Sequence, residues 1–87
     1  MSNNSVDEVH ISSYVVQTRP QQTEQIRTLI NEIYGAEIHG TNPQGKMVLI
    51  LESDSENDIS DLIIKINSIP GVINTALVFH QIDNEIV

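Results

Sequence analysis

The chain has 87 residues, no cysteine, and twelve Asp and Glu against four Lys and Arg. This length indicates one small domain with a single core, and the lack of thiols excludes a disulfide framework, a cysteine-based zinc site and a cysteine nucleophile. The net charge of −8 repels phosphate backbones, so we expect no nucleic-acid partner; it favours a basic partner, unless it serves solubility alone.

The start of the chain carries no export signal, because residues 1–8 contain no Lys, no Arg and no apolar stretch. No segment reaches the roughly 18 to 20 apolar residues of a membrane span, so we expect no membrane insertion. The pattern predicts a flexible N-terminal tail (residues 1–8), a folded domain (residues 9–82) and a C-terminal tail (residues 83–87).

The first half of the domain is typical of strand, helix and strand. Residues 9–18 are rich in β-branched side chains and lack Gly and Pro, which predicts a strand. Pro20 suits a first helical turn, and the apolar positions 26, 29, 30 and 33 recur at the spacing of one helical face. Gly35 suits the end of that helix, and residues 36–39 predict a second strand.

The second half repeats this order. Asn42, Pro43 and Gly45 are residues that a type I turn favours, and residues 46–52 predict a third strand. Ser53 or Ser55 can cap a helix whose apolar positions 59, 62, 63 and 66 repeat the helical stripe. The Pro-Gly pair at residues 70–71 ends this helix, and residues 72–81 predict the fourth strand.

The two halves echo each other, since residues 30–36 and 66–72 share one pattern of isoleucine, asparagine and a late glycine. Two strand–helix–strand units with right-handed crossovers interleave most simply as a ferredoxin-like split βαβ fold. The fold class is therefore α+β, with an antiparallel sheet in the order 4-1-3-2 and both helices on one face. An open two-layer variant is the alternative, which the duplication disfavours.

The central strands are apolar at successive positions, whereas a sheet with one solvated face alternates apolar and polar residues. Both faces should therefore be covered, one by the helices and the other by a partner. Because bulk belongs in the core, we assign Tyr14, Val16, Val48, Ile50, Leu77 and Phe79 to the helix side. The open face, and with it the predicted peptide-binding set, then consists of Ile11, Ser13, Val15, Met47, Leu49, Leu51, Ala76 and Val78.

The opposite assignment of faces stays open, because both alternating sets are apolar. In the chosen assignment, Ser13 and Ala76 lie on neighbouring strands and leave a shallow trough for a partner's helix or strand. A homodimer that stacks two such faces is the alternative.

The predicted topology also gathers charge, since the start of strand one lies beside the ends of strands three and four. The acidic pole at this end comprises Asp7, Glu8, Glu37, Glu52, Asp83 and Glu85, whereas Arg19 and Lys46 fall at the other end. An apolar trough with an acidic pole suits a peptide with a basic head. An acidic rim that contacts only solvent is the alternative.

Groups for catalysis are sparse. His10 and His80 could approach each other, but without cysteine and with loosely placed carboxylates the pattern does not supply a metal site. The sequence also lacks a nucleophile elbow and a glycine-rich phosphate loop. We therefore expect no enzyme activity, no catalytic residue, no metal and no cofactor.

Three segments carry a family resemblance: Ser12-Ser13-Tyr14-Val15-Val16-Gln17, Gly45-Lys46, and Ile69-Pro70-Gly71-Val72 running on to Leu77-Val78-Phe79-His80-Gln81. Together they resemble the NapD family, small cytoplasmic chaperones for the catalytic subunit of periplasmic nitrate reductase. The similarity covers about residues 9 to 82, and its most specific part is the ending at residues 78–81. Tyr34 departs from the pattern of the second half, which has Pro at the matching position.

The resemblance implies a ferredoxin-like, cytoplasmic protein that binds the twin-arginine signal peptide of that catalytic subunit. Binding would hold back Tat export until the molybdenum cofactor is inserted. Ser13, Val15, His80 and Gln81 are carried over only as motif positions. We expect a monomer or a weak homodimer; the alternative function is a small-molecule-sensing or dimerising regulatory module of the same fold.

Overall fold

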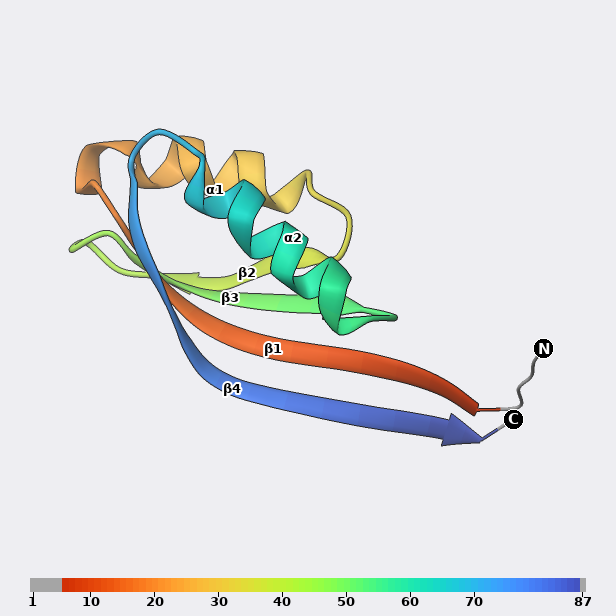
Figure 1. Cartoon of the computed structure of the whole chain (residues 1–87). Coiled ribbons are helices and arrows are strands. Elements are labelled where there is room, and N and C mark those ends of the chain that lie inside the picture. Colours follow the sequence, from red (N-terminus) through yellow and green to blue (C-terminus); the bar gives the residue numbers. More distant parts are fainter. Residues whose placement is uncertain (1–5, 87) are drawn as a thin grey trace.

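The computed structural model describes the backbone of residues 6–86 and the side chains of residues 9–80. Its elements are β1 (Val6–Thr18), the short 3-10 helix η1 (Pro20–Gln22), α1 (Thr23–Asn31), β2 (Ala36–Thr41), β3 (Lys46–Ser53), α2 (Glu56–Asn67) and β4 (Val72–Ile86). The strands form one antiparallel sheet in the order β2-β3-β1-β4. Both helices cover the same face of this sheet (Figure 1). The ferredoxin-like fold and its strand order are therefore confirmed.

Short polar contacts fix where the helices begin. The Ser55 hydroxyl accepts a hydrogen bond from the backbone N–H of Asp58 at 3.1 Å, so Ser55 is the N-cap of α2. The Ser53 hydroxyl instead donates to the Asp58 carboxylate at 3.1 Å. At the start of α1 the hydroxyls of Thr18 and Thr23, both buried, lie 2.9 Å apart, which ties the helix to the end of β1.

The predicted first and fourth strands are too short at their outer ends. β1 begins at Val6 and β4 ends at Ile86, and the backbones of these two residues are partners in the ladder. Because β1 pairs with β3 only from His10 onward, the β1–β4 pair continues past β3 as a two-stranded ribbon (Figure 1). Residues 1–5 and 87 of the predicted tails lie outside the described residues.

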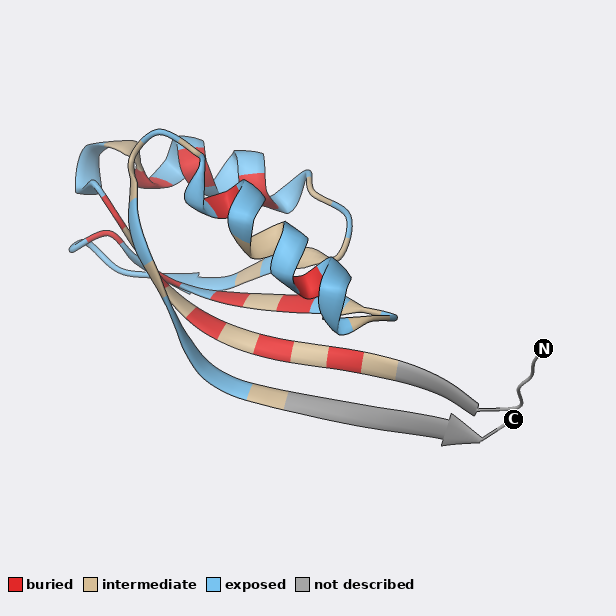
Figure 2. Ribbon diagram, viewed as in Figure 1, coloured by how far each residue is buried: buried red, intermediate tan, exposed pale blue. Residues whose placement is uncertain are grey.

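The hydrophobic core lies between the helices and the sheet. Its buried members are Tyr14, Val16, Ile26, Ile30, Met47, Leu49, Leu51, Ile59 and Ile66. Buried positions alternate with more exposed ones along β1 and β3 (Figure 2). Alternation of this kind means that each strand sends every second side chain to the helices and the others to the opposite face.

The predicted faces are wrong for β3. Met47, Leu49 and Leu51 are at most 1% exposed and face the helices, not the open face that the sequence predicts for them. The reason is register: Tyr14 lies opposite Leu49 in the ladder, and opposite residues share a face. Val48 and Ile50, assigned to the core from the sequence, therefore lie on the open face.

An irregularity in β4 changes the alternation there as well. The β1–β4 register shifts between Ser13, which pairs with Phe79, and Tyr14, which pairs with Leu77, so Val78 is an extra residue. Ala76 and Phe79 consequently share the open face although they are three residues apart. The assignment of Phe79 to the core is wrong, and Val78 occupies the bulge, 65% exposed, instead of a regular open-face position.

Gly35 holds the end of β3 against the α1–β2 connection. Its φ is +88°, its carbonyl accepts a hydrogen bond from the Glu52 N–H at 2.8 Å, and a Cβ here would lie 2.7 Å from the Glu52 carbonyl oxygen. Gly35→Ala should therefore lower the free energy of unfolding by about 1–3 kcal/mol, as measured by urea denaturation. Gly40→Ala is the control, because its new Cβ would meet no described heavy atom within 4 Å and its free energy of unfolding should not fall. An equal decrease in both variants would contradict this role of Gly35.

Candidate functional site

The sheet face opposite the helices is apolar over three neighbouring strands, β3, β1 and β4. We define the open face as Ile11, Ser13 and Val15 of β1, Val48 and Ile50 of β3, and Ala76 and Phe79 of β4. Val48 is 45% exposed and Phe79 is 51% exposed. Of the set predicted from the sequence, Ile11, Ser13, Val15 and Ala76 lie on this face.

No helix or strand of the described chain covers the open face, which lies on the lower side of the sheet in Figure 1. Apolar surface that is continuous over neighbouring strands is uncommon in isolated soluble domains and marks a site of association. The exposed apolar surface of the helices is not gathered in one patch. Their large exposed apolar residues are Leu29 and Ile64, which lie on separate helices. The open face is therefore the candidate surface for a partner.

A second feature adjoins it at the end of β3. An open hollow of about 630 Å³ lies where the α1–β2 connection meets β3 and the start of α2. Its lining carries the carboxylates of Glu37, Glu52, Asp54, Asp58 and Asp61 and one basic side chain, Lys65. We call this feature the acidic hollow.

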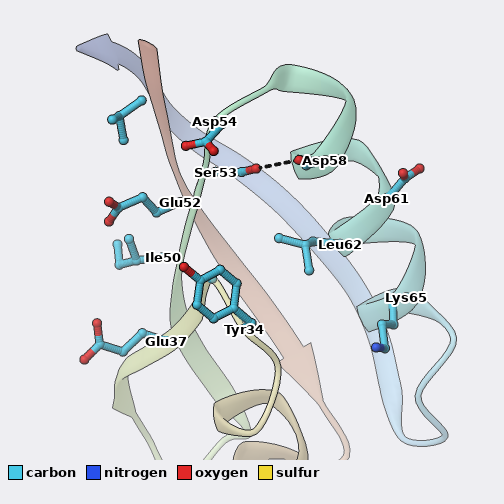
Figure 3. Close-up of a pocket in the computed structure, with 12 residues that line it drawn as sticks. Tyr34, Glu37, Ile50, Glu52, Ser53, Asp54, Asp58, Asp61, Leu62 and Lys65 are labelled. Carbon is cyan, nitrogen blue, oxygen red and sulfur yellow. Dashed lines mark hydrogen bonds between the residues drawn. The ribbon is translucent and has the colours of Figure 1, made fainter. Parts of the chain in front are cut away.

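The acidic hollow reaches around the edge of the sheet. Glu37 and Glu52 extend to one side of β3, Asp61 and Leu62 come from α2 on the other, and the Tyr34 ring stands between them (Figure 3). Because Glu37 lies opposite the open-face residue Ile50 in the ladder, the hollow is continuous with the open face. The ring of Tyr34 is almost wholly accessible, with the residue 98% exposed.

Two of these carboxylates already have partners within the protein. Asp58 accepts the hydrogen bond from the Ser53 hydroxyl, and Glu37 lies 3.2 Å from Nε2 of His39, an ion pair only when that histidine is protonated. No hydrogen bond or ion pair is found within the described part of the chain for the carboxylates of Glu52, Asp54 and Asp61. These three are available to a cationic group of a partner.

The predicted acidic pole is gathered in part. Glu37 and Glu52 both line the hollow, but the pole predicted from the sequence does not include Asp54, Asp58 and Asp61. Asp54 and Asp58 flank the α2 N-cap Ser55, and this cluster beside the end of β3 was the available signal. The backbone of Asp7 lies opposite Glu85, and that of Asp83 opposite Val9, whereas the side chains of Asp7, Glu8, Asp83 and Glu85 lie outside the described residues.

The two histidines of β1 and β4 meet, as the topology suggested. The ring centroids of His10 and His80 are 5.7 Å apart in an edge-on arrangement, and a hydrogen bond of 2.8 Å joins Ser12 Oγ to His80 Nδ1. His10 and Ser12 are buried on the helix side. Within the described residues, no group of three His, Cys, Asp or Glu side chains is arranged to hold a metal ion.

None of the helices formed by the described residues is long and apolar enough to cross a bilayer.

Comparison with known proteins decides the family. A family model described as NapD protein matches residues 9–84. This chain belongs to the NapD family. The resemblance seen in the sequence is thereby confirmed over almost the whole domain.

Named relatives and a solved structure agree. The Chaperone NapD of Escherichia coli K12 is 26% identical over 72 residues, 82% of this chain and 83% of that protein. The Chaperone NapD of Haemophilus influenzae is 29% identical over 77 residues, 87% of this chain and 83% of that protein. The solution structure of the E. coli Tat proofreading chaperone protein NapD matches with a TM-score of 0.79 and 26% identity, covering 84% of this chain and 78% of that one.

Proposed function

We propose that this protein is a maturation chaperone that binds the twin-arginine signal peptide of the periplasmic nitrate reductase catalytic subunit. Binding delays export through the Tat pathway until the molybdenum cofactor is inserted. The observation that carries the proposal is the apolar open face with the acidic hollow at its end. Membership of the NapD family, and a Tat proofreading chaperone of the same fold, support it.

The chemistry of a twin-arginine signal peptide complements this surface. Such a peptide has paired arginines followed by an apolar stretch. Guanidinium groups bind carboxylates through paired, charge-assisted hydrogen bonds, and Glu52, Asp54 and Asp61 offer such acceptors. The exposed ring of Tyr34 offers a face over which a guanidinium can lie, while the apolar stretch covers Val48, Ile50 and Phe79.

The protein acts in this proposal by binding alone, with no catalytic step and no resident cofactor. Covering the paired arginines hides the export signal from the membrane machinery. A signal peptide is made and must be held before export, so the chaperone works in the cytoplasm. The net charge of −8 opposes the stacking of two open faces, so the protein binds its peptide as a monomer.

Isothermal titration calorimetry tests the proposal with a synthetic peptide that carries the signal sequence of the nitrate reductase catalytic subunit from the same organism. We expect binding of one peptide per chain, weakened when both arginines are replaced by glutamine. Raising the salt from 0.05 to about 0.5 M should also weaken it, because salt screens the charged contacts. No heat of binding, with sedimentation showing a stable dimer, would favour the regulatory-module alternative.

Charge reversal separates the acidic hollow from the general acidity of the protein. Glu52→Lys should reduce peptide affinity about tenfold, because it removes one carboxylate and places a cation beside the guanidinium groups. Glu24→Lys is the matched control, since Glu24 lies in the first turn of α1 and does not line the hollow. Calorimetry at low salt measures both, and equal losses would show that only net charge matters.

A further inference from the structure

A second, smaller hollow lies at the other end of the open face. Its volume is about 350 Å³, and Val15, Gly40, Thr41 and Val48 line it together with residues of the β2–β3 hairpin. Gly40 lies opposite Val48 in the β2–β3 ladder, next to a register shift at His39. Since opposite residues share a face, the missing side chain of Gly40 is what opens this hollow on the open face. We call it the Gly40 hollow.

The fold does not need a glycine at this position. The glycines with positive φ are Gly35, Gly45 and Gly71, so the backbone of Gly40 is one that other residues adopt. A Cβ built on Gly40 meets no described heavy atom within 4 Å. Glycine inside a strand lowers stability relative to alanine, because glycine loses more conformational freedom on folding. The consequence of having glycine here is therefore a change in surface shape, obtained at some expense of stability.

The two hollows lie at opposite ends of one row of side chains. Glu52, Ile50 and Val48 point to the open face in succession along β3, and Glu52 lines the acidic hollow while Val48 lines the Gly40 hollow. Four residues of strand separate them, about 13 Å at the usual rise. Lys46 also lines the Gly40 hollow, so this end repels a cationic group that the other end attracts.

We propose that the Gly40 hollow receives an apolar side chain from the body of the bound signal peptide. The peptide then lies with its arginines at the acidic hollow and its apolar stretch directed towards the β2–β3 hairpin. This inference rests on the proposed function, since it assumes a bound peptide with a basic head. Charge fixes the direction: carboxylates at one end and Lys46 at the other make the reverse orientation unfavourable.

Gly40 is a specificity-determining position under this proposal. A side chain introduced here fills the space that the peptide residue would occupy, and its Cβ meets no described heavy atom within 4 Å. The loss of affinity should grow with the size of the introduced side chain. We expect less than a threefold loss for Gly40→Ala and at least a tenfold loss for Gly40→Val and Gly40→Leu.

The experiment is calorimetry of these three variants with the synthetic nitrate reductase signal peptide, accompanied by thermal unfolding. The melting temperatures should equal or exceed that of the wild type, because no contact is lost. As a second arm, each apolar peptide residue is replaced in turn by alanine. One such peptide should bind more weakly to the wild type and should lose less affinity on going to Gly40→Leu, because its trimmed side chain leaves room.

The outcomes distinguish the proposed function from the proposed role of the Gly40 hollow. If the wild type binds the peptide and Gly40→Leu, with an unchanged melting temperature, binds it equally well, the Gly40 hollow has no role and the proposed function stands. If the wild type does not bind the peptide, the proposed function is wrong, and the role of the Gly40 hollow, which depends on it, is wrong as well. The direction of the bound peptide is measured by NMR with a spin label at either end of the peptide. If the label next to the arginines broadens the amide signals of Gly40 and Thr41, the proposed orientation is wrong.

Discussion

Val48→Asp is expected to lower the affinity for the signal peptide by about a hundredfold or more while leaving the fold intact. Val48 lies on the open face between Val15 of β1 and Gly40 of β2 and is 45% exposed in the free protein, so an aspartate there stays hydrated until a partner binds. Under a bound apolar segment the carboxylate would lose its water without gaining a hydrogen bond. Leaving a polar or charged group in that state costs several kcal/mol, which corresponds to the expected loss.

The sign of the introduced charge makes this test discriminating. An added carboxylate strengthens the attraction for a basic peptide at long range, so electrostatics alone would raise the affinity of Val48→Asp. A loss can therefore come only from the apolar contact. Ile64→Asp is the matched control, because Ile64 is 64% exposed and lies on α2, which packs on the other side of the sheet.

Calorimetry with the synthetic signal peptide measures both variants, and circular dichroism confirms that both are folded. The control should bind as well as the wild type or slightly better. Should Val48→Asp retain the affinity of the wild type, the peptide does not lie over β3, and the proposed use of the open face is wrong. A similar loss in Ile64→Asp would instead point to a partner surface that extends over the part of α2 around Ile64.

The fold was predictable because two independent signals agreed. The helices carry their apolar residues at helical spacing, and glycine follows each of them at the point where the chain must turn, as Gly35 shows by its positive φ. The repeat of this unit then limits the topology, since right-handed crossovers and antiparallel neighbours leave few ways to interleave two copies. These signals are local in the sequence, so they can be recognised without knowledge of tertiary packing.

The faces of the strands were not predictable in the same way. Every position from Met47 to Leu51 is apolar, so alternation carries no information about which set is buried. What decides is the register with β1, where Tyr14 opposes Leu49, and a shift of one residue would exchange the faces. The bulge at Val78 is a further long-range feature, since only the pairing with β1 shows where β4 gains a residue.

The candidate site was predictable at the level of charge but not of shape. Strand order placed Glu37 and Glu52 at one end, and the structure brings both into the acidic hollow. Asp54, Asp58 and Asp61 were not predicted, because their place beside Glu37 and Glu52 depends on how α2 packs against the end of β3. The Gly40 hollow had no signal in the sequence, because an isolated glycine is usually read as a turn or bulge.

Leu49→Ala is expected to lower the free energy of unfolding by about 2–5 kcal/mol, the usual cost of removing a fully buried leucine side chain. Leu49 is 0% exposed and belongs to the core cluster between the helices and the sheet. A domain of this size typically has a free energy of unfolding of about 4–13 kcal/mol, so the loss takes a large part of its stability. Urea denaturation followed by circular dichroism measures it.

The adjacent position gives the comparison that fixes the faces. Val48→Ala removes a side chain that is 45% exposed and should lower the free energy of unfolding by less than about 1 kcal/mol. It should nevertheless weaken peptide binding, whereas folded Leu49→Ala should bind the peptide almost normally. If Leu49→Ala leaves no cooperative transition, Leu49→Val takes its place, with an expected loss of about 1 kcal/mol for the one buried CH2 group that it removes. The reverse pattern, a stable Leu49→Ala that no longer binds and a destabilised Val48→Ala that does, would mean that the faces of β3 are exchanged, and with them the surface on which the peptide lies.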